Sequence, residues 1–291
     1  MKVLIVGING MLGKELTNVL TEKHEVIGID SNPSASISGI DIQTGDICDQ
    51  KGIYDKITKA NPDIVILTAA LTDVDLCQRD QDLAYKINAL GPRNVALACQ
   101  RFDTQMMYIS TDYVFEGNKK ESYKEFDKTN PVSYYGSSKL YGELFVKDLL
   151  QRFYIVRTSW LFGHNRSNFI DGNATALIKS QKIKSCIDMV SSPTNVFDLS
   201  CAIEQLIESG LYGTYHITNS GFASRYDVSV KIAGVLGCPV SLIEKVKQKD
   251  LKLAALRPEF SALNHYNWKM SGFKPIRSWE DSVVEYLKKY I

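Results

Sequence analysis

The sequence predicts an α/β protein built around a doubly wound parallel sheet. Short runs of aliphatic and β-branched residues recur through the first half of the chain, and stretches with helical periodicity separate them. These runs are apolar throughout instead of alternating with polar residues, which is typical of strands covered by helices on both faces. Repeated strand–helix units of this kind join parallel strands through right-handed crossovers.

The expected elements follow in chain order. The first half carries strands at Val3–Val6, Glu25–Ile29, Asp63–Leu67, Gln105–Ile109 and Tyr154–Arg157, and helices at Met11–Leu20, Gln50–Ala60, Leu83–Arg101 and Tyr135–Leu150. After Ser159 the alternation loosens, with helices at Ile170–Ser180, Phe197–Glu208 and Arg225–Leu236 and an extended segment at Tyr215–Thr218. We therefore expect a first domain at residues 1–158 and a smaller C-terminal α/β part at residues 159–291, with some segments returning to the first domain.

The composition excludes several classes of partner. Of 291 residues, 44% are hydrophobic and 23% are charged, as in an ordinary globular protein. Lys plus Arg is 34 and Asp plus Glu is 33, so the net charge of +1 gives no global attraction to nucleic acid or an anionic membrane. No apolar run reaches the roughly 18 residues of a membrane span, and the apolar N-terminus is too short for a signal peptide. We expect a cytoplasmic protein.

The cysteines and histidines give no sign of a metal site. The six cysteines contain no Cys-x-x-Cys pair, and the four histidines are equally scattered. Small buried thiols in a reducing compartment explain this cysteine usage. We predict no metal.

A glycine-rich loop follows the first expected strand and leads directly into a helix. Gly7, Gly10 and Gly13 have the spacing G-x-x-G-x-x-G, which differs from the G-x-G-x-x-G of the standard fingerprint. Its position in the first strand–helix–strand unit favours dinucleotide binding over a simple tight turn. Glycines let the backbone approach a pyrophosphate, and the helix N-terminus offers free N–H donors. This loop makes residues 1–158 the expected dinucleotide-binding, Rossmann-type domain.

Asp30 ends the second expected strand, where a carboxylate accepts hydrogen bonds from the adenosine ribose. A solvated loop aspartate is the alternative. No Arg or Lys follows in Ser31, Asn32 and Pro33 to hold a 2′-phosphate, so we expect NADH to be preferred, with NADPH also accepted. Asp46 and the small residues Ala69 and Ala70 follow later strands at the same edge of the sheet.

Tyr135 and Lys139 lie four residues apart, which places a phenol and an ammonium on one helix face. Of the fifteen tyrosines, only Tyr135 has a lysine at this spacing. We expect the cation to lower the phenol pKa from about 10 toward working pH, which would make Tyr135 a general acid. Lys139 could also hold the nicotinamide ribose. An ordinary surface pair is the alternative.

Upstream, Ser110 and Thr111 end another expected strand. A hydroxyl at that edge could polarise a substrate carbonyl beside the tyrosine. Taken alone, the pair is a common strand end, but its order with the glycine loop and Tyr135 favours a functional role.

Together these motifs resemble the extended short-chain dehydrogenase/reductases, and among them the reductases of nucleotide-linked sugars. The similar segments cover most of the chain in order, and the pairing of STDYVF with YGSSK is specific. They are Gly7–Gly13, Thr68–Asp75, Ser110–Gly117, Pro131–Glu143, Arg157–Gly163, Pro193-Thr194 and Leu256–Leu263.

The resemblance implies NAD(P)H-dependent reduction of the 4-keto group of a nucleotide-linked 4-keto-6-deoxy sugar, with residues 159–291 mainly binding substrate. It implies that Thr111, Tyr135 and Lys139 are catalytic. Asp112 and Trp160 should contact the sugar nucleotide, and Arg257 should neutralise its diphosphate; a core aromatic and a surface ion pair are the alternatives for Trp160 and Arg257. The residues implied to line the cofactor are Gly10, Met11, Leu12, Asp30, Asp46, Ile47, Ala70, Leu71 and Thr72.

Other functions remain open on the sequence alone. A 4,6-dehydratase carries an Asp-Glu pair after the threonine, whereas Tyr113 follows Asp112 here. An epimerase would keep NAD bound and show no net redox change. The regulatory subunit of methionine adenosyltransferase shares the motifs without this catalysis. The expected partner is the nucleotide-sugar substrate, and the sequence leaves both its identity and a homodimer open.

Overall fold

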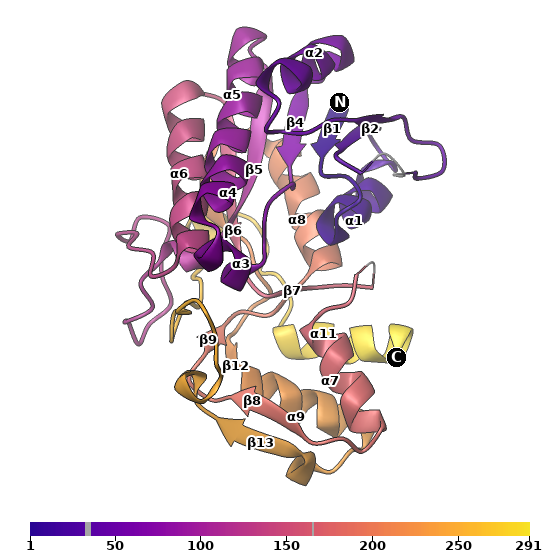
Figure 1. The fold of residues 1–291 in the computed structure, drawn as a ribbon. Coiled ribbons are helices and arrows are strands. Elements are labelled where there is room, and N and C mark those ends of the chain that lie inside the picture. The colour runs from indigo at the N-terminus through magenta and orange to yellow at the C-terminus, as the bar shows by residue number, and fades with distance from the viewer. Residues whose placement is uncertain (33–35, 165) are drawn as a thin grey trace.

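A computed structural model describes residues 1–32, 36–164 and 166–291. Its centre is a seven-stranded sheet in the order β11-β6-β5-β4-β1-β2-β3, and every neighbouring pair is parallel (Figure 1). The strands are β1 (Lys2–Val6), β2 (Glu25–Asp30), β3 (Ile42–Thr44), β4 (Ile64–Leu67), β5 (Gln105–Thr111), β6 (Phe153–Thr158) and β11 (Gly213–His216).

The strand order reverses at β1, which confirms the predicted doubly wound fold. Val6 pairs with Ile29 on one side and with Leu67 on the other, so the chain leaves β1 between β2 and β4. In open α/β sheets, ligands bind beyond the carboxyl ends of the strands at such a reversal.

The apolar strands bury side chains on both faces of the sheet. Val3 and Ile5 belong to one core, which also contains residues of α1 and α8. Leu4 and Val6 belong to a second core, under α2, α5 and α6. The helices of these layers are α1 (Met11–Leu20), α2 (Gln50–Ala60), α3 (Val74–Arg79), α4 (Gln81–Tyr85), α5 (Gly91–Arg101), α6 (Tyr134–Leu149) and α8 (Val196–Ser209).

The long helix expected at Leu83–Arg101 is interrupted. A π-helical segment, Lys86–Leu90, separates α4 from α5. Pro92 in the first turn of α5 explains the interruption, because its ring would clash with the carbonyl of residue 88 and its nitrogen has no hydrogen to donate. The wider turn places Asn88 inside the protein.

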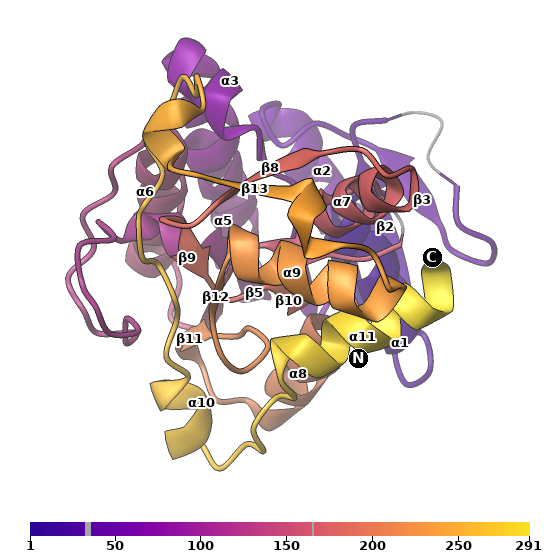
Figure 2. The ribbon, with the colours of Figure 1, turned by 90° about the horizontal axis from the view of Figure 1, so that it is seen from below.

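The C-terminal part forms a smaller layer against the sheet domain (Figure 1). Its core joins Phe162, Ile170, Ile232 and Val283. Figure 2 shows α9 and α11 lying together on this side of the molecule. Its elements are α7 (Phe169–Ile178), α9 (Arg225–Leu236), α11 (Trp279–Tyr290), and the short strands β7 (Leu161–Phe162), β8 (Ile183–Cys186), β9 (Val190–Ser191), β10 (Thr194–Asn195), β12 (Ala223–Ser224) and β13 (Ile243–Val246). The short helix α10 (Tyr266–Met270) lies against the main sheet.

Three segments beyond residue 159 belong to the sheet layer, and one of them, α10, packs against β11 with Trp268 in the sheet core. Strand β11 pairs with β6, and α8 packs against α1. The sequence did not predict β3, α3, α11 or the β8–β13 pair. Within the described residues, no helix combines the length and apolar character needed to span a bilayer.

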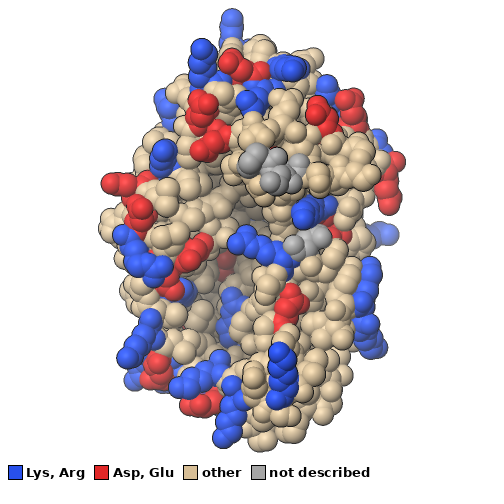
Figure 3. All heavy atoms as spheres, turned by 45° about the vertical axis from the view of Figure 1, so that its right-hand side comes forward, with Lys and Arg blue, Asp and Glu red and all other residues tan. Residues whose placement is uncertain are grey.

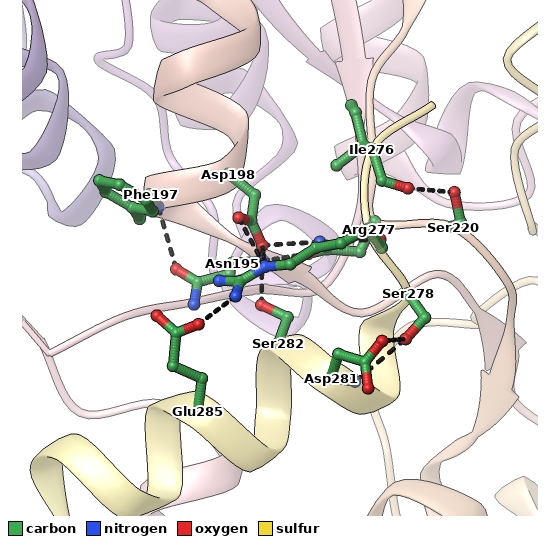
Figure 4. Close-up of polar contacts among 11 residues, drawn as sticks. Asn195, Phe197, Asp198, Ser220, Ile276, Arg277, Ser278, Asp281, Ser282 and Glu285 are labelled. Carbon is green, nitrogen blue, oxygen red and sulfur yellow. Dashed lines mark hydrogen bonds and ion pairs between the residues drawn. The ribbon is translucent and has the colours of Figure 1, made fainter. Parts of the chain in front are cut away.

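Asp198 joins α8 to the C-terminal helix (Figure 4). Its carboxylate accepts hydrogen bonds from Arg277 Nε, Asn219 Nδ2 and Ser282 Oγ at 2.9, 2.7 and 2.8 Å. Arg277 also pairs with Glu285 on α11. A largely buried carboxylate with this many donors holds the two parts of the chain in a fixed arrangement.

Candidate active site

A cavity of about 980 Å³ opens at the carboxyl ends of the strands, against the C-terminal part. Figure 3 shows the surface hollowed between the two parts of the molecule, with Lys and Arg side chains near its edge. Every predicted site residue except Arg257 lines this cavity. They are Gly7, Gly10, Met11, Leu12, Gly13, Asp30, Asp46, Ile47, Ala69, Ala70, Leu71, Thr72, Thr111, Asp112, Tyr135, Lys139 and Trp160.

The glycine loop leaves no room for side chains at two of its positions. Gly7 has φ +94°, and a Cβ there would lie 2.5 Å from the Ala69 nitrogen. A Cβ on Gly13 would lie 2.4 Å from the Gly7 carbonyl oxygen. No side chain caps the N-terminus of α1, so its first N–H groups can bind an anion. This geometry suits a pyrophosphate.

Asp30 holds the glycine loop against the end of β2. Its Oδ2 accepts a hydrogen bond from the Asn9 N–H, and its Oδ1 accepts one from the Asn32 N–H, both at 2.9 Å. Each oxygen retains a second lone pair. The carboxylate therefore shapes the loop and can still accept hydrogen bonds from a ligand.

Asn88 supports the loop that follows β4, and sequence reasoning missed it. Its Oδ1 accepts from the Leu71 N–H at 2.9 Å, and its Nδ2 donates to the Leu71 carbonyl at 2.9 Å and to Ser138 Oγ at 3.1 Å. The amide thus connects this wall of the cavity to α6. The one sequence signal for this role is that Asn88 is a polar residue on an otherwise apolar face of its helical segment.

Tyr135 lies in the first turn of α6, where the Ser133 hydroxyl accepts a hydrogen bond from the Gly136 N–H at 3.2 Å. The edge of its ring packs against Tyr113, with 5.6 Å between centroids. The prediction of a lowered phenol pKa is wrong for this structure. Burial raises the pKa of Tyr135, and a hydrogen bond with Thr111 only partly opposes that effect.

The side chain of Lys139 is directed toward strand β5. Its Nζ donates a hydrogen bond of 2.7 Å to the Ile109 carbonyl and lies 4.1 Å from the centroid of the Tyr108 ring. Burial lowers the pKa of Lys139 to about 7, although Glu143 favours the charged form. A cation that is itself half neutral near pH 7 does little to stabilise a phenolate.

Asp112 is fully surrounded by hydroxyl groups. Thr111 Oγ1 donates to its Oδ1 at 3.1 Å, Ser191 Oγ donates to its Oδ2 at 2.7 Å, and Ser261 donates to the same oxygen. Burial raises the pKa of Asp112 to about 6 against the effect of these donors. Because Ser191 and Ser261 belong to the C-terminal part, the carboxylate connects both parts beside Tyr135.

Glu143, also missed from sequence, anchors α6 beneath the site. It accepts from Arg157 Nε and Nη2 at 2.9 and 2.7 Å and from Ser110 Oγ at 2.6 Å. Its burial alone would raise the pKa of Glu143, but Arg157 and Ser110 hold it below its usual range. This network fixes the helix that carries Tyr135 relative to the strand that carries Thr111.

Of the two residues that the resemblance implied for substrate binding from the C-terminal part, Trp160 lies at the cavity and Arg257 does not. Trp160 lines the cavity, and the Arg225 guanidinium lies 3.7 Å above its ring centroid. Arg257 does not line the cavity. It forms two hydrogen bonds of 2.8 Å with the Asp75 carboxylate, which is the ion-pair alternative for this residue.

One cluster of potential metal ligands lies away from the cavity lining. His24, Glu204 and Glu208 offer ligand atoms within 4.8 Å of one another in the described chain. Lys23 Nζ lies 3.2 Å from Glu204 and 3.7 Å from Glu208, so an ammonium already balances these carboxylates. The prediction of no metal remains untested.

The parallel sheet, the glycine loop and the helix carrying Tyr135 and Lys139 define an extended short-chain dehydrogenase/reductase. A family model described as RmlD substrate binding domain matches residues 1–291, and the chain belongs to that family. This match confirms the predicted family resemblance. It also confirms, at family level, that the chain is an NAD(P)H-dependent oxidoreductase like dTDP-4-dehydrorhamnose reductase.

Similar proteins match over nearly their whole length. The spore coat polysaccharide biosynthesis protein SpsK of Bacillus subtilis (strain 168) is 34% identical over 99% of this chain and 97% of its own. The dTDP-4-dehydrorhamnose reductase of Streptomyces griseus is 30% identical over 97% and 91%. The crystal structure of dTDP-4-dehydrorhamnose reductase from Bacillus anthracis str. Ames, in complex with NADP, covers 99% of both chains with 36% identity and a TM-score of 0.92.

Proposed function

We propose that this protein reduces the 4-keto group of a dTDP-linked 4-keto-6-deoxy sugar, with NADH preferred and NADPH accepted. The observation that carries the proposal is the position of the Tyr135 phenol beside the Thr111 hydroxyl, in the same cavity as the glycine loop. The names of the relatives from Streptomyces griseus and Bacillus anthracis support the dTDP sugar.

Residues of this chain account for the proton transfer. The raised pKa of Tyr135 keeps its phenol protonated at neutral pH, so its Oη can donate a proton to the C4 oxygen as negative charge develops there. Thr111 Oγ1 lies beside the phenol and orients it. Lys139 is held by the Ile109 carbonyl and is available to donate a hydrogen bond to the nicotinamide ribose.

The cavity is suited to a nicotinamide dinucleotide, which would supply the hydride. The pyrophosphate would bind the uncapped N-terminus of α1 and the narrow path past Gly7 and Gly13. Asp30 would accept hydrogen bonds from the adenosine ribose, and this supports the preference for NADH. The Bacillus anthracis relative was solved with NADP, which supports the acceptance of NADPH.

The dehydratase and the purely regulatory role lack a supporting feature in the site. A dehydratase needs a second carboxylate after Asp112, and that position holds the buried Tyr113, packed against Tyr135. A purely regulatory role would not require the intact arrangement of Thr111, Tyr135 and Lys139 around one cavity. A homodimer and a cytoplasmic location stay predictions.

The test is a panel of nucleotide-linked 4-keto-6-deoxy sugars assayed for oxidation of NADH and NADPH. We expect stoichiometric oxidation with dTDP-linked 4-keto sugars and none with the corresponding 4-hydroxy sugars. Conversion of a sugar without net oxidation of the cofactor would indicate an epimerase. Cofactor binding without turnover on any member of the panel would contradict the proposal and favour a regulatory role.

A further inference from the structure

Arg225 is the first residue of α9 and contacts two aromatic rings on the C-terminal wall of the cavity. The carbon atom at the centre of its guanidinium is 3.7 Å from the centroid of the Trp160 ring and 4.4 Å from that of the Phe169 ring. All three side chains line the cavity. Cation–π contact uses the flat face of a guanidinium and leaves its N–H edges free for hydrogen bonding.

This guanidinium has no carboxylate partner among the described residues. Arg157 and Arg257, by contrast, are paired with Glu143 and Asp75. Burial lowers the pKa of Arg225 to about 10, which shows how little compensation its charge receives. The charged or titratable groups that act on it are Asp112, Tyr113, Cys186 and Arg257, and the Asp112 carboxylate is already bound by three hydroxyls.

A partly buried cation without a carboxylate partner is stabilised when a bound ligand brings an anion to it. The cavity has room for that anion, and Arg166, a second cation of the C-terminal wall, is exposed. The ligand chemistry that suits a guanidinium with free N–H edges is a phosphate, because its oxygens accept two parallel N–H bonds.

We propose that Arg225, in contact with Trp160 and Phe169, binds the diphosphate of the nucleotide-sugar substrate. This inference rests on the proposed function. When the keto group of the sugar lies at Tyr135, the diphosphate attached to the sugar would lie near the C-terminal wall, which carries Arg225. Arg257, which the sequence resemblance implied for this role, is already paired with Asp75.

The test compares binding of dTDP and thymidine to the full-length protein by isothermal titration calorimetry. The variants are Arg225→Met, Arg225→Lys and, as a matched control from the same cavity, Arg166→Met. We expect Arg225→Met to weaken dTDP binding roughly 10- to 100-fold, the value of one charge-assisted hydrogen bond, with thymidine binding unchanged. Arg225→Lys should recover part of the loss, and Arg166→Met should change dTDP binding by only a few-fold.

The outcomes separate this inference from the proposed function. If the wild type binds dTDP much more tightly than thymidine and Arg225→Met keeps that ratio, the role of Arg225 is overturned while the proposed function stands. If Arg166→Met, and not Arg225→Met, loses the preference for dTDP over thymidine, the role of Arg225 is likewise overturned. If the wild type does not distinguish dTDP from thymidine, the proposed function and this inference both fail. Thermal unfolding of each variant checks that the change lies in binding and not in folding; should Arg225→Met fail to fold, Arg225→Lys provides the comparison.

Discussion

The ammonium of Lys139 donates a 2.7 Å hydrogen bond to the backbone carbonyl of Ile109, two residues before the end of β5 that carries Thr111. The lysine therefore connects α6 to this strand. Its pKa of about 7 reflects a cation removed from water and given few partners. A ligand that accepts a hydrogen bond from Nζ would favour the charged form.

This predicts a pH-dependent affinity for the cofactor. As the pH rises through about 7, Lys139 loses its proton in the free protein. Binding of NADH then requires Lys139 to take up a proton, because the bound form favours the charged ammonium. Affinity for NADH should therefore fall by up to about tenfold per pH unit. In Lys139→Met, affinity should be weaker at pH 6 and independent of pH. Titrations of NADH by fluorescence between pH 6 and 9 measure this; parallel profiles for both proteins would remove Lys139 from cofactor binding.

Replacement of Tyr135 by Phe tests the proton donor. We expect turnover to fall by roughly 10²–10⁴-fold, the usual contribution of a general acid, while the Kd for cofactor hardly changes. The hydroxyl is needed as charge develops on the substrate oxygen and contributes little to cofactor binding. Steady-state kinetics and cofactor titration give both quantities, and a turnover within a few-fold of wild type would exclude Tyr135 as the acid.

The fold was largely predictable because its signals are local. Apolar runs specify buried parallel strands, and the α6 and α9 boundaries follow from periodicity within one or two residues. The residues of the glycine loop and the Tyr135–Lys139 pair, also identified from local patterns, line one cavity.

The features that sequence does not reveal involve partners distant in the chain. Arg257 pairs with Asp75, 182 positions away, and no local pattern reveals this ion pair; its predicted role at the diphosphate stays a prediction. The raised pKa of Tyr135 follows from burial, which helical spacing does not fix. The position of Arg225 at the cavity could not be read from the sequence, because its aromatic partners Trp160 and Phe169 come from separate segments.

The buried Asp112 predicts a pH effect on stability. The pKa of Asp112 is about 6 in the folded protein, against 3.8 for an exposed aspartate, so between these two pH values the folded state binds a proton that the unfolded state does not. A raised pKa contributes stability that is present below pH 3.8 and is lost as the pH rises through 6. The difference in unfolding free energy between wild type and Asp112→Asn should therefore fall by about 2 to 3 kcal/mol from about pH 4 to 7. Urea unfolding at several pH values measures it, and a constant difference would contradict the shift.

Asp30 predicts the cofactor preference. A 2′-phosphate would lose a hydrogen bond to this carboxylate and be repelled by it, so kcat/KM should favour NADH by roughly 10- to 100-fold. Asp30→Asn, which keeps an acceptor for the Asn9 N–H, should bring the two constants closer. Equal constants in the wild type, or a preference for NADPH, would mean that Asp30 does not face the ribose. The Lys56 side chain, which passes Gly45 at the cavity, would then be the residue to test.

The central claim is that this cavity transfers a hydride to C4 of a nucleotide-linked sugar. Its most direct test is the reaction of a dTDP-linked 4-keto-6-deoxy sugar with NADH carrying deuterium on the transferred position of C4 of its nicotinamide ring. NMR and mass spectrometry of the isolated product then locate the label. The account predicts one deuterium at C4 of the product sugar and stoichiometric formation of NAD⁺. Unlabelled product with the deuterium retained on the cofactor, or a sugar altered at another carbon, would contradict it.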